Sequence, residues 1–214
     1  WNLDRVDRVV SGGAGPTEGM IRRFRDEHGV EVIHSWGVTE INPVGTMSPA
    51  ATTREEVDFD PDRRLRHQTV AGRPLPGLAV EIVDEEGLPL PHDGTTTGRL
   101  LVSGWWVAED YAFDHPDGDR FGPDGRLDTG DVASIDDRGR MAIRDRAKDM
   151  IKSGGEWISS LALERAIGDF PEIEGCAVVG RPDDRWGERP VVFASLHEGA
   201  SLDVETVRDR LDHD

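Results

Sequence analysis

The chain opens with a strand, a glycine-rich turn, a helix and a second strand, and this succession constrains the fold more than any other feature. Arg5–Val10 is predicted to form a short strand and Ser11–Thr17 the glycine-rich turn. Thr17 can cap a helix that ends just before Gly29. The β-branched segment Val30–His34 is predicted to form a buried strand. Two strands joined through a helix are typical of a parallel sheet, so the first part is predicted to be α/β.

The pattern changes at about Gly45. Gly and Pro together make up 38 of the 214 residues, about 18% against a usual ~12%, which predicts many turns and short strands. Short strands separated by such turns are expected at four places, namely Leu78–Val83, Gly98–Ser103, Val132–Ile135 and Met141–Arg144. This middle region is predicted to be an antiparallel sheet or a small barrel.

A third pattern, which mixes strands and helices, follows a boundary that we place near Asp145. The strands are expected at Lys148–Ile151, Ala177–Gly180 and Val191–Leu196, and the helices at Ser160–Asp169 and Val204–Leu211. The fold class predicted for the whole chain is therefore α/β plus β, followed by a small α+β domain. The chain starts at Trp1 without an initiator Met and stops inside a predicted helix, so we expect it to be a piece of a longer protein.

Charge and composition exclude several classes of function. The formal net charge is −18, which argues against a nucleic-acid-binding protein and against docking on an anionic membrane. No apolar run approaches the ~18 residues of a membrane helix. Cys176 is the only cysteine, so no internal disulfide can form, and a reducing, cytoplasmic location is expected.

Three loops contain residues suited to a nucleotide. Gly12-Gly13-Ala14-Gly15 could bring bare backbone against it, or form an ordinary tight turn. His34-Ser-Trp36-Gly-Val-Thr39-Glu40 follows a buried strand, where α/β sheets bind ligands, although a Thr-Glu pair is also a common helix cap. Asp128-Thr-Gly-Asp131 offers a carboxylate that could accept the hydroxyls of a ribose.

A fourth segment concentrates the lysines. The chain has 25 basic residues, of which only Lys148 and Lys152 are lysine, and they lie within four residues of each other. An ammonium group differs from a guanidinium in charge density and geometry. The two neighbouring lysines therefore indicate either that this segment requires an ammonium group or that they lie together by chance. Ser153-Gly154-Gly155 follows directly and could hold a phosphate through its backbone N–H groups.

Taken in order, these motifs resemble the adenylate-forming superfamily of acyl-CoA synthetases, luciferases and peptide-synthetase adenylation domains. The motifs are Ser11-Gly-Gly-Ala14, Trp36-Gly-Val-Thr39-Glu40, Gly72-Arg-Pro-Leu-Pro-Gly77, Thr129-Gly-Asp131 and Asp145-Arg-Ala-Lys-Asp-Met-Ile-Lys-Ser-Gly-Gly-Glu-Trp-Ile-Ser159. Within the superfamily, the last motif and the segment from His34 are most similar to medium- and long-chain fatty-acyl-CoA synthetases.

The resemblance implies a role for individual residues. It assigns nucleotide binding to Gly12, Gly13, Ala14, His34, Trp36, Gly37, Thr39, Asp131 and Arg146. It assigns the thioester step with CoA to Lys152, Gly154, Gly155 and Trp157. It makes Thr39, Glu40 and Lys152 catalytic, Glu40 the ligand of Mg²⁺ and Asp145 the hinge between two domains.

The resemblance also implies a domain organisation. Residues 1–145 would be the end of a large domain, with an α/β part at 1–44 and a β-barrel-like part at 45–145, and residues 146–214 the front of a small C-terminal domain. Such enzymes carry an upstream phosphate-binding loop and a late lysine that are both absent from this sequence. The chain by itself is therefore predicted to be inactive.

For the intact protein, the resemblance implies an ATP-dependent ligase that converts a fatty acid, ATP and CoA into acyl-CoA, AMP and pyrophosphate. ATP, Mg²⁺ and CoA are the expected cofactors and co-substrates, and a carboxylic acid is the expected partner. Two alternatives stay open: an adenylating enzyme for another acid or for a carrier protein, and a non-catalytic nucleotide-binding fragment. The oligomeric state is open too, with a homodimer as one candidate.

Overall fold

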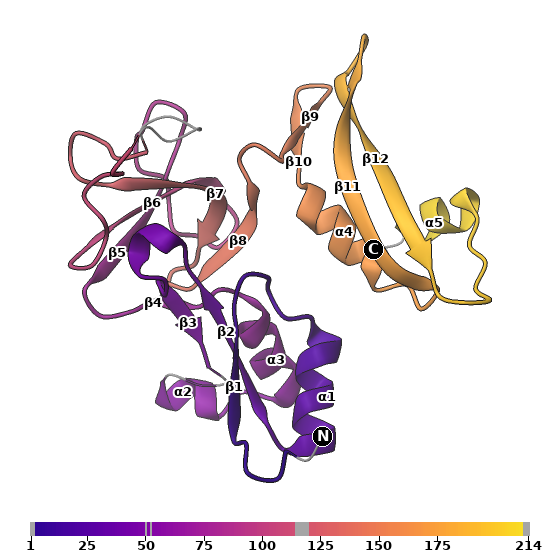
Figure 1. The fold of residues 1–214 in the computed structure, drawn as a ribbon, viewed down its shortest axis with the longest axis horizontal. Helices are drawn as coiled ribbons and strands as arrows, with labels where there is room; N and C mark the ends of the chain where they lie inside the picture. Colours follow the sequence, from indigo (N-terminus) through magenta and orange to yellow (C-terminus); the bar gives the residue numbers. More distant parts are fainter. Residues whose placement is uncertain (1–2, 50, 52, 114–119, 212–214) are drawn as a thin grey trace. The chain divides into compact units, whose positions relative to one another are not determined.

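The computed structural model describes residues 3–49, 51, 53–113 and 120–211 of the chain (Figure 1). These residues divide into two compact units, residues 1–143 and residues 144–214.

The first sheet of unit 1 confirms the predicted strand–turn–helix–strand succession. Its strands are β1 (Arg8–Ser11), β2 (Glu31–Trp36), β3 (Thr46–Ser48) and β4 (Arg73–Pro74), hydrogen-bonded in that order. β1 and β2 are parallel, whereas β3 is antiparallel to both β2 and β4. The sheet therefore continues to Pro74, beyond the limit at residue 44 that the change of sequence pattern predicts.

Helix α1 (Glu18–His28) connects the two parallel strands and has the predicted caps. The Thr17 hydroxyl accepts a hydrogen bond from the Met20 N–H at 3.2 Å, and Gly29 ends the helix in the left-handed conformation, with a φ of 67°. The helix buries Ile21 against Val32 of β2. This packing fixes the turn that precedes the helix at the end of β1.

Two further helices, α2 (Arg54–Val57) and α3 (Pro61–Thr69), lie in a region where only strands are predicted. Asp60 caps α3 by accepting a hydrogen bond from the Arg63 N–H at 2.9 Å, and proline occupies the first helical position. Leu65 of α3 joins the cluster of α1 and β2. The α/β part is thus larger than the sequence indicates.

The second sheet is open, and its last strand continues along the chain past Ile143, the last residue of unit 1. It consists of β5 (Leu78–Val83), β6 (Gly98–Gly104), β7 (Leu127–Ile135) and β8 (Met141–Arg146), in that order. β5 pairs antiparallel with β6, and β6 antiparallel with β7. In the described part of the chain these strands do not close into a barrel, so of the two predicted forms the antiparallel sheet is the one that the structure has. Buried apolar side chains of β5–β8, such as Leu100 and Ile135, form the main core together with Trp36.

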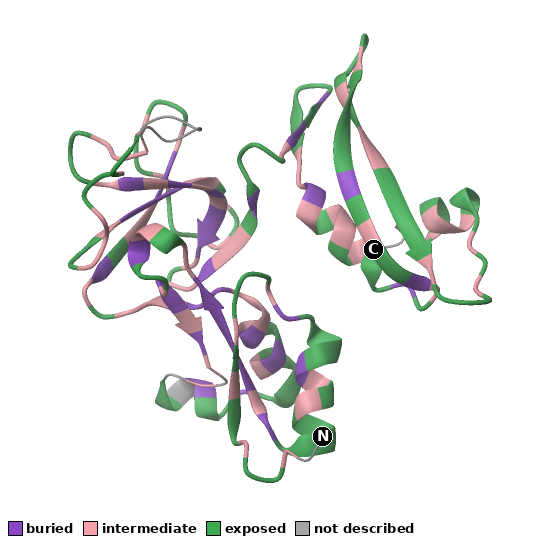
Figure 2. Cartoon of the chain, in the orientation of Figure 1, coloured by how far each residue is buried: buried purple, intermediate pink, exposed green. Residues whose placement is uncertain are grey.

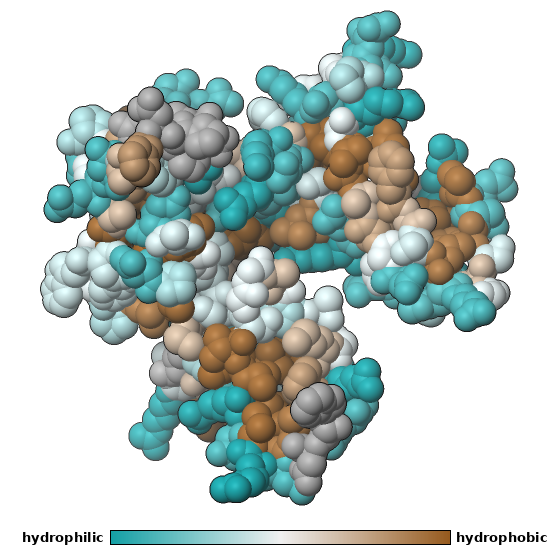
Figure 3. Space-filling view, viewed as in Figure 1, coloured by the Kyte–Doolittle hydropathy of each residue, from teal (hydrophilic) through white to brown (hydrophobic). Residues whose placement is uncertain are grey.

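Unit 2 is a sheet with helices packed on it. The strands are β9 (Ile151–Ser153), β10 (Glu156–Ile158), β11 (Ile173–Asp183) and β12 (Gly187–Leu196), and the helices are α4 (Ser160–Gly168) and α5 (Val204–Leu211). The strand order is β10-β9-β12-β11. A core of apolar residues joins α4, α5 and β11. Apolar side chains, Val179, Val192 and Phe193 among them, are exposed on β11 and β12, and apolar surface is visible over this hairpin in Figure 3.

The predicted strand Lys148–Ile151 is wrong. Lys148 lies in a turn, because the N–H groups of Asp149 and Met150 both bond the carbonyl of Arg146, at 3.0 and 3.1 Å. The strand begins only at Ile151, whose side chain enters the core of unit 2.

Candidate functional site

The carboxyl end of β2 carries the Trp36–Glu40 motif. β2 is buried along nearly its whole length, as its purple ribbon in Figure 2 shows. After Trp36 the chain turns into a short 3₁₀ helix, Thr39–Ile41, which holds Thr39 and Glu40. The turn depends on Gly37, because a Cβ at this position would lie 1.7 Å from the carbonyl oxygen of Pro43. The motif is therefore held by a close backbone approach that only glycine permits.

A buried hydrogen bond joins this motif to the Thr-Gly-Asp motif. The indole Nε1 of Trp36 donates to Oδ2 of Asp131 at 2.9 Å, and both residues are buried. The two residues are 95 positions apart and come from β2 and β7, strands of different sheets. The structure thus brings together two motifs that the sequence analysis singled out separately. A hydrogen bond to a carboxylate in such surroundings contributes about 1.5–3 kcal/mol.

Asp131 lies within β7 and not in a loop, and the register shift of β7 against β6 at this point is fixed by the hydroxyl of Thr129. Oγ1 of Thr129 donates to the carbonyl of Leu100 at 3.0 Å and accepts from the N–H of Asp131 at 3.1 Å. Gly130 has a φ of +72°, and its N–H donates to Oδ1 of Asp128 at 3.0 Å. Asp131 is therefore held at its backbone N–H by Thr129 and at its carboxylate by Trp36.

The glycine-rich loop lies beside the end of β2. Ser11, the last residue of β1, is in register with His34, and a Cβ added at Gly12 would lie 3.4 Å from the carbonyl oxygen of Ser35. Gly13 follows with a φ of +86°, and Ala14 is exposed. His34 is buried, and its Nδ1 is 3.1 Å from the carbonyl oxygen of Thr69 at the end of α3.

Glu40 meets a residue that the sequence analysis did not select. The hydroxyl of Tyr111 donates a hydrogen bond to Oε1 of Glu40. Tyr111 is the only tyrosine of the chain, which is the one signal that could have drawn attention to it. Among the described residues no group of three or more His, Cys, Asp or Glu side chains could hold a metal ion.

Asp145, the expected hinge, is buried at the start of unit 2. Its Oδ2 accepts from the hydroxyl of Ser160 at 3.0 Å and from the N–H of Leu161 at 3.2 Å. Its Oδ1 accepts from the N–H of Arg146 at 2.7 Å. These bonds attach Asp145 to the N-terminus of α4, where a carboxylate also interacts favourably with the helix dipole.

The residues expected to serve the CoA step lie on the β9–β10 hairpin. Lys152 and Trp157 are directly paired across it, and Nζ of Lys152 is 5.3 Å from the centroid of the exposed Trp157 ring. Gly154 and Gly155 form the turn, with φ values of +62° and +91°. The ring of Trp186 lies against Gly154, because a Cβ added at Gly154 would be 2.9 Å from the nearest ring atom.

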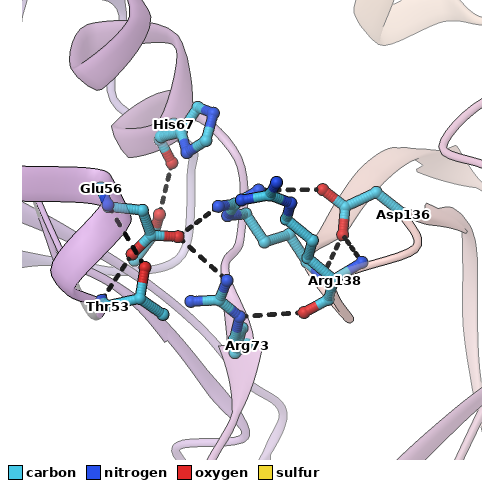
Figure 4. Close-up of polar contacts among 8 residues, drawn as sticks. Thr53, Glu56, His67, Arg73, Asp136 and Arg138 are labelled. Atoms are coloured by element: carbon cyan, nitrogen blue, oxygen red, sulfur yellow. Dashed lines mark hydrogen bonds and ion pairs between the residues drawn. The ribbon is translucent and has the colours of Figure 1, made fainter. Parts of the chain in front are cut away.

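A buried ion network in unit 1 was also missed by the sequence analysis (Figure 4). The Glu56 carboxylate of α2 accepts from the Thr53 N–H at 2.9 Å, from Nη2 of Arg73 at 2.9 Å and from Arg140. Arg140 also pairs with Asp136 at 3.2 Å. Burial, together with the charge of Arg140, lowers the pKa of the neighbouring His67. The network connects α2 and β4 to the turn between β7 and β8.

Comparison with solved structures defines the class of protein. The ATP-bound MatB of Rhodopseudomonas palustris matches 95% of this chain with a TM-score of 0.80 and 29% sequence identity, over 38% of its own length. The fold is therefore that of adenylate-forming enzymes. The chain belongs to the AMP-binding enzyme family, which matches residues 2–112. The C-terminal domain of AMP-binding enzymes matches residues 162–214.

Two curated relatives are named CoA ligases. A medium-chain-fatty-acid–CoA ligase of Ectopseudomonas oleovorans is 46% identical over 92% of this chain and 35% of its own length. A 3-methylmercaptopropionyl-CoA ligase of Ruegeria lacuscaerulensis is 43% identical over 92% of this chain and 36% of its own length. The chain thus spans about a third of the length of these relatives. No helix in the described ranges is long and apolar enough to cross a membrane.

Proposed function

We propose that this chain is part of an acid–thiol ligase that joins a carboxylic acid to CoA through an acyl-adenylate. The observation that carries the proposal is the buried bond between Trp36 and Asp131. It joins the two motifs to which nucleotide binding is assigned, at the end of a strand where α/β sheets bind ligands. The names of the relatives support the same activity.

In this proposal the first unit holds the nucleotide. Asp131 accepts the ribose hydroxyls, Thr39 donates its hydroxyl to the α-phosphate, and the Gly12–Ala14 loop and Trp36 border the adenine. His34 and Gly37 shape the end of β2 beneath the base. Carboxylates are suited to ribose hydroxyls because two acceptor oxygens match two neighbouring donors.

Glu40 would hold Mg²⁺. Mg²⁺ is usually bound through one or two carboxylates together with substrate phosphates, so a single glutamate beside a nucleotide fits this ion. When bound, Mg²⁺ supplies neutralisation of the phosphate charge. Glu40 contributes a hard oxygen ligand at a point that the 3₁₀ helix Thr39–Ile41 fixes.

The reaction proposed has two steps. An oxygen of the substrate carboxylate attacks the α-phosphorus of ATP, the bond to the β-phosphate breaks, and pyrophosphate leaves. The CoA thiolate then attacks the acyl carbonyl, and AMP leaves. No protein nucleophile is required, and positioning supplies most of the catalysis. Lys152, Gly154, Gly155 and Trp157 serve the second step, Arg146 assists at the ribose, and the small domain turns at Asp145.

The acid is proposed to be a medium- or long-chain fatty acid. A short thioether acid is the second candidate, because one relative at 43% identity is named for 3-methylmercaptopropionate. Location in the cytoplasm and assembly as a homodimer are further proposals that rest on the sequence analysis alone.

The test is product formation by the intact enzyme. The protein is incubated with ATP, Mg²⁺, CoA and one acid at a time from a panel of fatty acids and short thioether acids. Acid-dependent release of pyrophosphate and a thioester detected by mass spectrometry are expected, and the isolated 214-residue chain should give neither. Pyrophosphate release with no thioester for any acid would contradict the CoA step, and the absence of both would contradict the proposal as a whole.

A further inference from the structure

The Glu40 carboxylate is held by a residue from a distant part of the chain. The hydroxyl of Tyr111, 71 residues further on, donates to Oε1 of Glu40. Hydrogen bonding of one carboxylate oxygen restricts the rotation of the whole group, since both oxygens are attached to the same carbon. The orientation of Glu40 is thus coupled to the position of Tyr111.

The segment that carries Tyr111 is attached to the Glu40 helix at further points. The N–H of Ala108 donates to the carbonyl of Glu40 at 2.8 Å. Nδ2 of Asn42 donates to the carbonyl of Trp106 at 2.8 Å. Backbone and side-chain bonds together therefore keep the Tyr111 segment beside the helix Thr39–Ile41.

The Tyr111 ring has its own support. It meets Phe121 edge-to-face, with ring centroids 5.3 Å apart, and Phe121 packs against the main core of unit 1. Phe121 also bridges to Leu127 at the start of β7, the strand that carries Asp131. The phenol is thus supported by the same strand that presents the ribose-binding carboxylate.

We propose that Tyr111 is a positioning residue, which orients the Glu40 carboxylate for the Mg²⁺–nucleotide complex. The inference rests on the proposed function, in which Glu40 is the protein ligand of the ion. Side chains that hydrogen-bond a metal ligand orient it, and their loss typically lowers metal affinity by about 10–100-fold. Tyr111 acts through Glu40 and needs no contact with the substrate.

The experiment measures how much Mg²⁺ strengthens ATP binding. Calorimetric titrations of the intact enzyme with ATP are made once with saturating Mg²⁺ and once with EDTA, without acid or CoA. Tyr111→Phe removes the hydroxyl and keeps the ring that packs on Phe121. Glu40→Gln removes the ligand charge, and Phe113→Leu, an exposed ring of the same segment, is the matched control.

Tyr111→Phe should reduce the Mg²⁺-dependent gain in ATP affinity by about tenfold and leave ATP affinity in EDTA unchanged. Glu40→Gln should reduce the gain at least as much, and Phe113→Leu should retain it. The inference would be overturned if Tyr111→Phe kept the full Mg²⁺-dependent gain in ATP affinity while Glu40→Gln lost part of it. The proposed function would then still stand. An equal loss of ATP affinity with and without Mg²⁺ in Tyr111→Phe would also overturn it, because it would indicate a general structural role. A full gain in Glu40→Gln would overturn both the inference and the metal role of Glu40.

Discussion

At the scale of single residues, the candidate site depends on two glycines with different demands. A Cβ at Gly37 would lie 1.7 Å from the Pro43 oxygen, far inside any real contact, whereas a Cβ at Gly12 would meet the Ser35 oxygen at 3.4 Å, an ordinary separation. Gly37 is therefore required by the backbone itself. Gly12 is compatible with a side chain, so its proposed role lies in leaving room for a nucleotide.

This difference predicts opposite outcomes for two alanine substitutions. Gly37→Ala should destabilise unit 1 by about 4 kcal/mol or more, because the loop after β2 must move. Gly12→Ala should change stability by less than about 1 kcal/mol and weaken ATP binding. Thermal unfolding followed by circular dichroism tests stability, and calorimetry tests binding. A Gly37→Ala protein that unfolds at the same temperature as the parent would show that the loop is not constrained as described.

At the scale of elements, the Glu56 network connects helix α2 and strand β4 to the β7–β8 turn. Nε of Arg73 donates to the carbonyl of Arg138 at 3.0 Å, and Asp136 accepts from the N–H of Arg140 at 2.7 Å. Close by, Gly72 and Met141 exchange backbone hydrogen bonds of 3.2 and 2.7 Å. These contacts and the Trp36–Asp131 bond join the two sheets of unit 1.

Removal of the central carboxylate should therefore be costly. Glu56→Ala leaves Arg73 and Arg140 without their shared buried partner, and breaking a buried ion pair in this way typically costs about 3–5 kcal/mol. Glu56→Gln should cost less, because the amide oxygen still accepts a hydrogen bond. Glu85→Ala removes an exposed glutamate and serves as the control. Denaturant unfolding measures all three, and a Glu56→Ala protein as stable as the control would contradict the structural role of the network.

The elements that could be predicted from sequence are those with local signals. Helix α1 has a threonine cap and a terminal glycine, and both act as predicted. Helix α3 was missed because Leu65 and Gln68 are its only buried residues, so its apolar pattern is weak, although Asp60-Pro61 is a start signal. The Glu56 and Tyr111 contacts were missed for a different reason. They join residues far apart in the sequence, and no local pattern encodes such a pairing.

At the scale of the whole molecule, the two units contain different parts of the proposed chemistry. Unit 1 contains Thr39, Glu40 and Asp131, and unit 2 contains Asp145, Arg146 and Lys152. The hinge role of Asp145 stays a prediction, but its bonds to Ser160 and Leu161 attach its side chain to α4. A rotation of unit 2 would therefore carry the Asp145 carboxylate with the helix.

The proposed function requires a nucleotide site built around Asp131 and Trp36. ATP binding to the intact enzyme, measured by calorimetry for the parent, Asp131→Asn and Asp137→Asn, tests it most directly. The asparagine at position 131 keeps an acceptor for the Trp36 N–H and loses the charge, whereas Asp137 is an exposed residue of the β7–β8 turn. Asp131→Asn should weaken ATP binding by about tenfold or more, equivalent to at least about 1.4 kcal/mol, and Asp137→Asn should bind as the parent does. Equal affinity of the parent and Asp131→Asn for ATP would contradict a nucleotide site at Asp131.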